Sequence, residues 1–248
     1  MQATIMKVMA GAGLLAACVG ALAAEHVAVK RPVDLPPSAD LSYALKARQK
    51  GITLGGEGTL NWRVDEGKYS VATEARVPVF GKLLENHSEG VIDSFGLAPL
   101  KWTEKRFRKE ASITTFDRTA RQITFSVGEK NFPLIGGEQD RASAQWQMVA
   151  VARGAPDKMV SGSVWRFFVA GRRDAEPWTF KVVGREKVQT GLGLIEAVHL
   201  SKSPPADYPD QRLDLWLAPS KQWYPIKLRL EEDDGEYVEQ ILDKITPK

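Results

Sequence analysis

Alternation of apolar and polar residues over most of the chain limits its fold more than any other feature. Leu60, Trp62 and Val64 alternate with polar neighbours, and the same pattern runs through residues 69–79. Successive side chains of a strand point to opposite faces, so a period of two predicts strands with one buried face. Similar runs continue as far as Leu230, and turns rich in glycine, proline and aspartate separate them. The spacing predicts an antiparallel meander of about ten or more strands.

One segment in the middle of the chain departs from this pattern. Residues 140–153 place Trp146 and Val149 on one helical stripe. Asp140 is the expected N-cap of this helix, and Gly154 follows its last turn. The predicted fold is therefore mainly β, an antiparallel meander curled into a half-barrel or an open barrel around one central helix. A ligand of such a sheet is expected on its concave face.

The first residues have the composition of an export signal. Lys7 is the only charge before Glu25, and the residues between them are apolar or small. Ala21-Leu22-Ala23 offers an Ala-x-Ala cleavage site. These features predict a secretory signal peptide at residues 1–23 and a periplasmic protein after its cleavage.

A lipoprotein signal is a second interpretation of the same residues. Leu15-Ala16-Ala17-Cys18 has the form of a lipobox, in which the cysteine is lipidated and becomes the first residue. Membrane association is expected only in this case, through acyl chains on Cys18. Cys18 is also the only cysteine, so after ordinary cleavage the chain has no thiol for a disulfide, for catalysis or for a metal. The choice between the two signals stays open, as does a start at Met1 or Met6.

The rest of the chain predicts a short linker followed by one domain. Residues 24–40 contain three prolines and no apolar period, which is typical of an extended linker, and residues 41–248 read as a single β-rich domain. Without residues 1–23 the chain carries 33 basic and 31 acidic residues, too even a balance to predict a nucleic-acid partner. The densest basic cluster, at residues 101–109, is diluted by glutamate, so a solvated strand face explains it better than a site for anionic lipid.

The residue types that usually carry catalysis form no recognisable set. Ser163 lacks the second glycine of a nucleophile turn, and no pair of carboxylates is marked by its spacing. His26 lies in the expected linker, where it would be solvated. His199 shares a strand face with apolar residues, as a satisfied structural histidine does. We predict no catalytic residue, no cofactor and no metal site.

His87 is the one histidine with a metal-like arrangement, and it is a weak candidate. Glu85, His87 and Glu89 would line one face of a strand. Three ligands from a single extended strand, with no fourth ligand elsewhere, make a poor metal site. An exposed polar face explains the same spacing.

Seven tryptophans are the remaining unusual feature of the composition. Core packing explains most of them, because a tryptophan buries a large apolar area. A minority that lines an apolar cavity would explain the others, and Trp62 on a strand and Trp146 on the helix are the candidates for ligand binding. The glycines at 51, 55, 56 and 58 lie inside a strand pattern, which predicts bulges or sharp curvature there.

Several short motifs resemble one protein family. Residues 138–145 (EQDRASAQ) resemble a Gln-Asp-x-x-Ser phrase of the proteobacterial envelope proteins grouped as domain-of-unknown-function family 3108. Residues 87–99 are similar to the Ser-Glu-Gly and Gly-Leu-x-Pro phrases of that family, and residues 212–228 to its C-terminal Trp-Leu-Ala hairpin. Tyr224 departs from the leucine expected before the proline of that hairpin. The resemblance runs from residue 41 to residue 242.

This resemblance implies an exported, β-rich envelope domain with no assigned catalytic residues. It also implies that Asp140 caps the helix and that Ser143 bonds in its first turn. A looser similarity, of architecture alone, is to the half-barrels of the LolA/LolB-like lipoprotein carriers.

Three functional hypotheses follow from the sequence. The first is a non-enzymatic periplasmic protein that binds an acyl chain, a lipid or a hydrophobic partner segment on its concave face. The second is a structural or adaptor protein of the envelope with a filled core, which would contact an envelope protein or a membrane through a sheet edge or the basic residues 101–109. The third is an unrecognised hydrolase.

Overall fold

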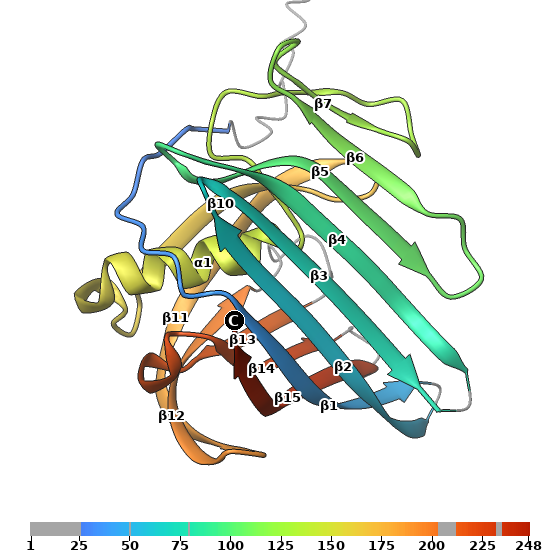
Figure 1. The fold of residues 1–248 in the computed structure, drawn as a ribbon, viewed down its shortest axis with the longest axis vertical. Helices are drawn as coiled ribbons and strands as arrows, with labels where there is room; N and C mark the ends of the chain where they lie inside the picture. The colour runs from blue at the N-terminus through green and yellow to red at the C-terminus, as the bar shows by residue number, and fades with distance from the viewer. Residues whose placement is uncertain (1–25, 50, 79, 203–211, 232–234) are drawn as a thin grey trace, which may run out of the picture.

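The computed structural model describes residues 26–49, 51–78, 80–202, 212–231 and 235–248 (Figure 1). Strands dominate this part of the chain. In chain order they are β1 Ala39–Gln49, β2 Ile52–Asp65, β3 Lys68–Val77, β4 Gly81–Asp93, β5 Gly96–Arg106, β6 Ser112–Asp117, β7 Gln122–Phe125, β8 Phe132–Pro133, β9 Gln139–Asp140, β10 Val164–Ala170, β11 Ala175–Thr190, β12 Gly193–Lys202, β13 Arg212–Leu217, β14 Pro225–Glu231 and β15 Tyr237–Pro247. The helices described are α1 Ser143–Gly154 and the short 3₁₀ helices η1 Pro156–Lys158 and η2 Pro219–Lys221.

All fifteen strands belong to one sheet, in the order β8-β7-β6-β5-β4-β3-β2-β1-β15-β14-β13-β12-β11-β10-β9. Neighbours in the sheet are also neighbours in the sequence, except that β1 pairs with β15. The pairs are antiparallel, apart from β9 with β10, which is parallel. The sheet stays open between β8 and β9 and curls around α1 (Figure 1). This confirms the predicted mainly β meander, in its half-barrel form.

Two glycines allow the backbones of neighbouring strands to approach closely. A Cβ on Gly56 of β2 would collide with the backbone oxygen of Arg76, and one on Gly90 of β4 would collide with the backbone oxygen of Ala98. Any other residue at these two positions would push the strands apart. Gly56 lies in the glycine-rich stretch for which the sequence predicts curvature. Gly51 does not lie inside a strand as predicted, because it belongs to the turn between β1 and β2 and has φ 76°.

The helix begins three residues later than the sequence predicts. α1 starts at Ser143, and Asp140 belongs to the short strand β9. Asp140 still accepts hydrogen bonds from the backbone N–H groups of Ala142 and Ser143, both at 2.8 Å, so its carboxylate satisfies free donors of the first turn from the strand. At the other end α1 stops at Gly154, where a Cβ would lie 2.7 Å from the backbone of Pro32.

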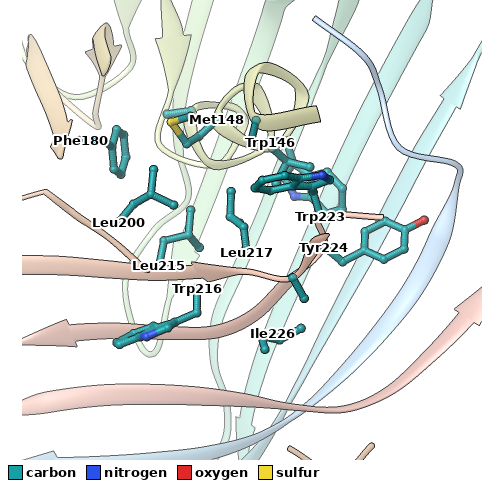
Figure 2. Packing of buried hydrophobic residues seen from close by; sticks show 14 of the residues in the cluster. Trp146, Met148, Phe180, Leu200, Leu215, Trp216, Leu217, Trp223, Tyr224 and Ile226 are labelled. Atoms are coloured by element: carbon teal, nitrogen blue, oxygen red, sulfur yellow. The ribbon is translucent and has the colours of Figure 1, made fainter. Parts of the chain in front are cut away.

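α1 packs on the concave side of the sheet and fills one end of it (Figures 1 and 2). Trp62 of β2 and Trp146 of α1 stack with ring centroids 4.3 Å apart and 6° between their planes. Both side chains are fully buried. Figure 2 shows the same helix facing Leu215 and Leu217 of β13 across the core.

Residues 26–38 contain no strand or helix, yet they lie against the domain. The backbone N–H of Asp34 donates to the carbonyl of Ala150 in α1 at 2.9 Å, and the indole N–H of Trp62 donates to the carbonyl of Pro36 at 2.9 Å. Arg153 near the end of α1 forms an ion pair with Asp34 at 2.9 Å. The part of the expected linker that the structure describes is therefore bound to the helix and to the core.

The two halves of the sheet meet near the N-terminus of α1. Ser88 of β4 donates to the carboxylate of Asp140 in β9 at 2.5 Å, and the side-chain amide of Gln139 donates to the carbonyl of Leu97 in β5 at 2.7 Å. A small second apolar cluster packs at this junction: Phe116, Ile123, Leu134 and Ala170. We call this covered end of the concave face the proximal end. The distal end is the one formed by the halves of β1 to β4, β14 and β15 that lie away from α1.

Candidate functional site

Six neighbouring strands carry apolar side chains on the concave face at its distal end. Leu54 pairs with Ala47, Ala47 with Val238, and Val238 with Leu230, so one apolar row crosses β2, β1, β15 and β14. Parallel rows on either side continue onto β3 and β4. We call the aliphatic members of these rows the distal band: Leu45, Leu54, Val77, Leu84, Leu228, Leu230 and Val238.

The distal band is only partly covered. Leu54, Leu84, Leu228 and Leu230 are half-buried, and Val238 is 37% exposed. Leu228 and Leu230 also pack against the edge of the main core. α1 contacts β2 at Trp62, in the half of that strand away from Leu54, and its other close neighbours include β5, β9 and η1. The band therefore extends the apolar interior beyond the reach of the helix.

Glycines on β2 leave the floor of the band without side chains. Gly58 faces Tyr43 and Leu45, and a Cβ built on it would lie 3.2 Å from a methyl group of Leu45. Gly56 cannot carry a side chain at all, because of the Arg76 backbone. No side chains therefore project from the concave face of β2 at Gly56 and Gly58, in the middle of the band.

A polar row borders the distal band on the side of β3 to β5. Thr73, Asn86 and Glu104 are cross-strand neighbours on the same face. Glu104 accepts a hydrogen bond from Arg106 at 2.7 Å and lies 3.5 Å from the guanidinium of Arg172. The side-chain oxygen of Asn86 is buried and has no hydrogen-bond partner within the described part of the chain. Apolar and polar surfaces thus lie side by side on the concave face.

The two tryptophans predicted to bind a ligand lie at the proximal end and contact each other. Trp62 donates its indole N–H to Pro36, and the edge of the Tyr224 ring meets Trp146 with centroids 6.1 Å apart (Figure 2). The structure brings this predicted pair together. A role of Trp62 and Trp146 as ligand contacts stays a prediction.

The weak metal candidates share the outer face of β4, as their spacing predicts. Glu85 forms an ion pair with Lys82, and Nε2 of His87 lies 3.3 Å from a carboxylate oxygen of Glu89. Glu85 and His87 line an open polar depression of about 390 Å³ on this outer face. Among the described residues no group of three His, Cys, Asp or Glu side chains is placed to hold a metal ion.

A buried polar network holds the proximal end, and we call it the Asp140 network: Tyr69, Ser88, Asp140 and Ser143. The Tyr69 and Ser88 hydroxyl oxygens are 3.1 Å apart, and the hydroxyl of Ser143 accepts the backbone N–H of Asp140 at 2.8 Å. Burial raises the pKa of Asp140 to about 6, against the lowering effect of its hydrogen bonds from Ser88 and Ser143. Ala142 holds the N-cap position, so Asp140 is not the N-cap that the sequence and the family resemblance imply, although it accepts the backbone N–H groups of Ala142 and Ser143. Ser143 bonds at the first turn as the resemblance implies, whereas Tyr69 and Ser88 were not foreseen.

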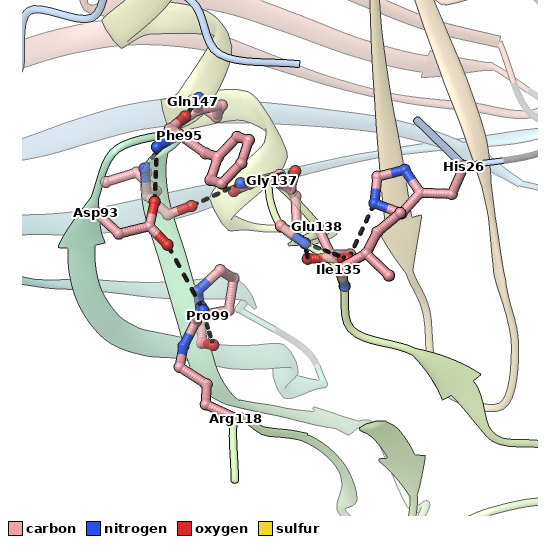
Figure 3. Close-up of polar contacts among 12 residues, drawn as sticks. His26, Asp93, Phe95, Pro99, Arg118, Ile135, Gly137, Glu138 and Gln147 are labelled. Carbon is pink, nitrogen blue, oxygen red and sulfur yellow. Dashed lines mark hydrogen bonds and ion pairs between the residues drawn. The ribbon is translucent and has the colours of Figure 1, made fainter. Parts of the chain in front are cut away.

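Gln147 makes a second link between α1 and the sheet (Figure 3). Its amide donates to the carbonyl of Phe95 at 2.7 Å, and its side-chain oxygen accepts the backbone N–H of Leu97 at 2.8 Å. Gly96 between them has φ 105°, and a Cβ there would lie 2.5 Å from the Gln147 side chain. The sequence does contain a signal for this link, because Gln147 is a polar residue at a core-facing position of the helix, where a hydrogen-bond partner is required.

His26 is not solvated, contrary to the prediction from its place before the domain. Its side chain is 11% exposed, its ring stacks on Phe168 with centroids 4.7 Å apart, and its Nε2 lies 3.0 Å from Glu138 (Figure 3). Burial alone would raise the pKa of Glu138, but hydrogen bonds from His26 and from the backbone of Ile135 and Gly136 outweigh it and lower the pKa. The prediction failed because the preceding segment folds back onto the domain.

His199 is a satisfied structural histidine, as predicted. Its Nε2 lies 2.9 Å from Asp214, and its ring stacks on Trp216 with centroids 4.4 Å apart. Cys18 and the expected signal peptide at residues 1–23 lie outside the described residues. Within the described part of the chain, no helix has the length and apolar character needed to cross a membrane.

Solved structures align with most of the chain at low sequence identity. A DUF1329 family protein from Desulfovibrio piger shares 9% identity at a TM-score of 0.34, with 87% of each chain covered. A protein described as an outer membrane lipoprotein-sorting domain, from Vibrio parahaemolyticus, shares 7% identity at a TM-score of 0.30, with 86% of each chain covered. A protein described as exported and YmcC-like in fold, from Bacteroides fragilis, shares 11% identity at a TM-score of 0.32, covering 89% of this chain and 100% of that chain. No curated protein sequence matches this chain.

A family model matches the sequence across nearly all of the sheet. The match extends over residues 40–242 and so includes both the Asp140 network and the whole distal band. It confirms the resemblance that the motif at residues 138–145 indicates. The chain therefore belongs to the family described as proteins of unknown function, DUF3108.

Proposed function

We propose that this protein is a non-enzymatic component of the bacterial periplasm that binds the acyl chain of a lipid on its distal band. The observation that carries the proposal is the band itself. Its aliphatic side chains face the concave side of the sheet, five of the seven remain partly exposed while Leu45 and Val77 are buried, and the described part of α1 packs at the other end. Concave apolar surface of this kind is typical of ligand sites.

The shape of the band favours a long chain over a compact ligand. Its rows cross six strands from β4 to β14. Neighbouring strands lie about 4.8 Å apart, so the band is roughly 24 Å long. Each methylene group buried on it would contribute about 0.8 kcal/mol. Burial of roughly ten of them would contribute about 8 kcal/mol, which is comparable to the usual cost of association.

The polar row beside the band supports an amphiphilic ligand. Arg106 and Arg172 flank Glu104, which leaves a net positive charge on the row, and the Asn86 oxygen is without a partner there. A polar or anionic head group can bond to such a row while its acyl chain lies on Leu228 and Leu230.

The acidic side chains of the concave face are engaged in structural contacts, which supports a binding role without catalysis. Glu104 pairs with two arginines, and Asp140 is fully buried in its network. A general base needs access to substrate. Neither carboxylate offers it.

Native mass spectrometry of the protein recovered from a bacterial periplasm, with organic extraction of what it carries, tests this function. We expect a recurrent lipid-sized adduct in the wild type. The double change Leu228→Gln and Leu230→Gln should remove the adduct, because it places polar amides in the band. Val183→Gln, at an exposed position of β11, serves as the matched control and should retain it.

Two results would overturn the proposal. One is a wild-type mass free of lipid in repeated preparations, and the other is an adduct that survives the double change. Circular dichroism must show that the double variant is folded, since an unfolded variant would lose any ligand and its loss of the adduct would then not support the proposal. Either result would favour a structural or adaptor role in the envelope.

A further inference from the structure

Two turns at the distal edge of the sheet present an exposed pair of aromatic rings. Alternate turns of an antiparallel meander share one edge, so the β3–β4 and β5–β6 turns lie together (Figure 1, right). Phe80 in the first is 48% exposed, and Phe107 in the second is 38% exposed. Their centroids are 6.2 Å apart with 66° between the rings. Exposed aromatics that pair across two turns form a patch, unlike single exposed residues.

Both turns are held in place by backbone hydrogen bonds. The N–H of Phe80 donates to the carbonyl of Val77 at 3.1 Å, and the N–H of Phe107 donates to Leu83 of the neighbouring strand at 2.8 Å. Arg108 adopts the left-handed conformation at φ 53°, as a residue in a tight turn does. Both aromatic residues are thus hydrogen-bonded to residues of the sheet through their backbone N–H groups.

Basic side chains flank the pair. Residues 105–110 contain four basic residues and one acid, and the guanidinium of Arg108 lies 4.8 Å from the Phe107 ring centre. No described carboxylate forms an ion pair with Lys105, Arg108 or Lys109, whereas Lys82, at the start of β4, is paired with Glu74 and Glu85. We call Phe80, Phe107, Arg108 and Lys109 the aromatic–basic tip.

We propose that the aromatic–basic tip docks the protein on the surface of an anionic phospholipid bilayer. Aromatic rings favour the interface between head groups and acyl chains, and lysine and arginine are attracted to anionic lipid. The tip combines both at one edge of the sheet, so its chemistry complements such a surface. Docking there is independent of a lipid anchor at Cys18 and of any ligand on the distal band. It would bring the open end of the concave face to the bilayer.

Vesicle flotation of the protein exported to a bacterial periplasm tests the docking surface. Every sample carries Cys18→Ser, so that no acyl anchor contributes, and its intact mass is checked for removal of the signal. We expect partition into vesicles of phosphatidylcholine with 30% phosphatidylglycerol and little partition into phosphatidylcholine alone. Phe80→Ser with Phe107→Ser should lower the partition about tenfold or more. Arg108→Glu with Lys109→Glu should lower the partition roughly fivefold or more for each basic residue that is replaced.

Matched controls alter residues of similar exposure elsewhere. Val160→Ser with Leu194→Ser changes side chains that are 58% and 60% exposed, and Lys181→Glu with Lys187→Glu reverses two charges on β11. Both should leave the partition unchanged, and circular dichroism should show every variant folded. The proposal is wrong if the wild type does not float with anionic vesicles, or if the two tip variants float as well as it does. A tip variant that no longer floats but still carries its lipid adduct would show that docking and ligand binding are separate properties of the protein.

Discussion

The two ends of the concave face are built from the same strands but covered in different ways. At the proximal end the stacked pair Trp62 and Trp146 and the buried Asp140 network fill the space between helix and sheet. At the distal end the same alternation continues, yet Leu230 and its neighbours in the distal band are half-exposed. The two ends differ because α1 covers the proximal end and does not cover the distal band.

This comparison separates folding from binding in one sheet. Residues of the proximal end contact each other through buried rings and short hydrogen bonds, so changing them should mainly alter the free energy of unfolding. Residues of the distal band have fewer contacts to lose. Changes there should mainly alter what the protein binds. The predictions below test this division.

Trp146→Ala should give the largest loss of stability. The side chain is fully buried and stacks on Trp62 at 4.3 Å, so its removal leaves a cavity between helix and sheet. We expect a loss of about 3–5 kcal/mol in the free energy of unfolding, measured with urea. Leu194→Ala, at a 60% exposed position, is the control and should change it by less than about 0.5 kcal/mol. Equal effects of the two changes would contradict the proposed division.

The Asp140 carboxyl should make stability depend on pH. Its pKa is raised to about 6 in the folded protein, from 3.8. A raised folded-state pKa means that the folded state holds the proton more tightly, so this contribution is complete below pH 3.8 and is lost as the pH rises through 6. We expect the wild type to lose about 2 kcal/mol relative to Asp140→Asn between about pH 4.5 and pH 7.

Urea unfolding of both proteins across this pH range makes the measurement. The difference between the two curves isolates Asp140, because every other titrating group is common to both. Parallel curves would show that the buried carboxyl titrates as it does in the unfolded chain. The Asp140 network would then not be closed to water.

Ser88→Ala should have a smaller effect on the same network. It removes the hydroxyl that donates to Asp140 at 2.5 Å, leaving a buried acceptor short of one partner. We expect a loss of about 1–2 kcal/mol in the free energy of unfolding. Because the Ser88 hydrogen bond lowers the pKa of Asp140, its loss should also move the pH-dependent transition upward. Ser161→Ala removes an exposed hydroxyl that bonds to Val183 and is the matched control, with an expected change below about 0.5 kcal/mol.

The strands and the helix could be predicted because their signals are local. Alternation about Leu60, Trp62 and Val64 follows from a pleat of period two, and Trp146 and Val149 follow from a helix of period 3.6. The start of the helix was predicted wrongly because it depends on a contact between segments far apart in the sequence. Asp140 pairs with β10 as part of β9, and it caps the first turn from there.

The parts of the site that were missed depend on contacts between distant segments. Ser88 meets Asp140 across 52 positions of sequence, and His26 meets Glu138 across 112. No local pattern marks such partners. The distal band consists of predicted strand residues, but their partial exposure depends on where α1 ends, which alternation does not encode. Phe80 and Phe107 lie in turns, outside the periodic pattern, so their pairing could not be anticipated.

Gly58→Ala should have the smallest effect on stability and a clear effect on binding. The new methyl group would stand on the floor of the distal band, 3.2 Å from Leu45, whose flexible side chain can move by a few tenths of an ångström. Alanine gains roughly 0.5–1 kcal/mol over glycine in a strand through the unfolded state, which offsets the close contact. We expect the free energy of unfolding to change by less than about 1 kcal/mol. The fraction of protein carrying a lipid adduct in native mass spectra should fall, because the methyl group occupies the space over which an acyl chain would lie. A drop in stability like that of Trp146→Ala, with the adduct unchanged, would place the distal end in the folding core and remove the contrast between the two ends.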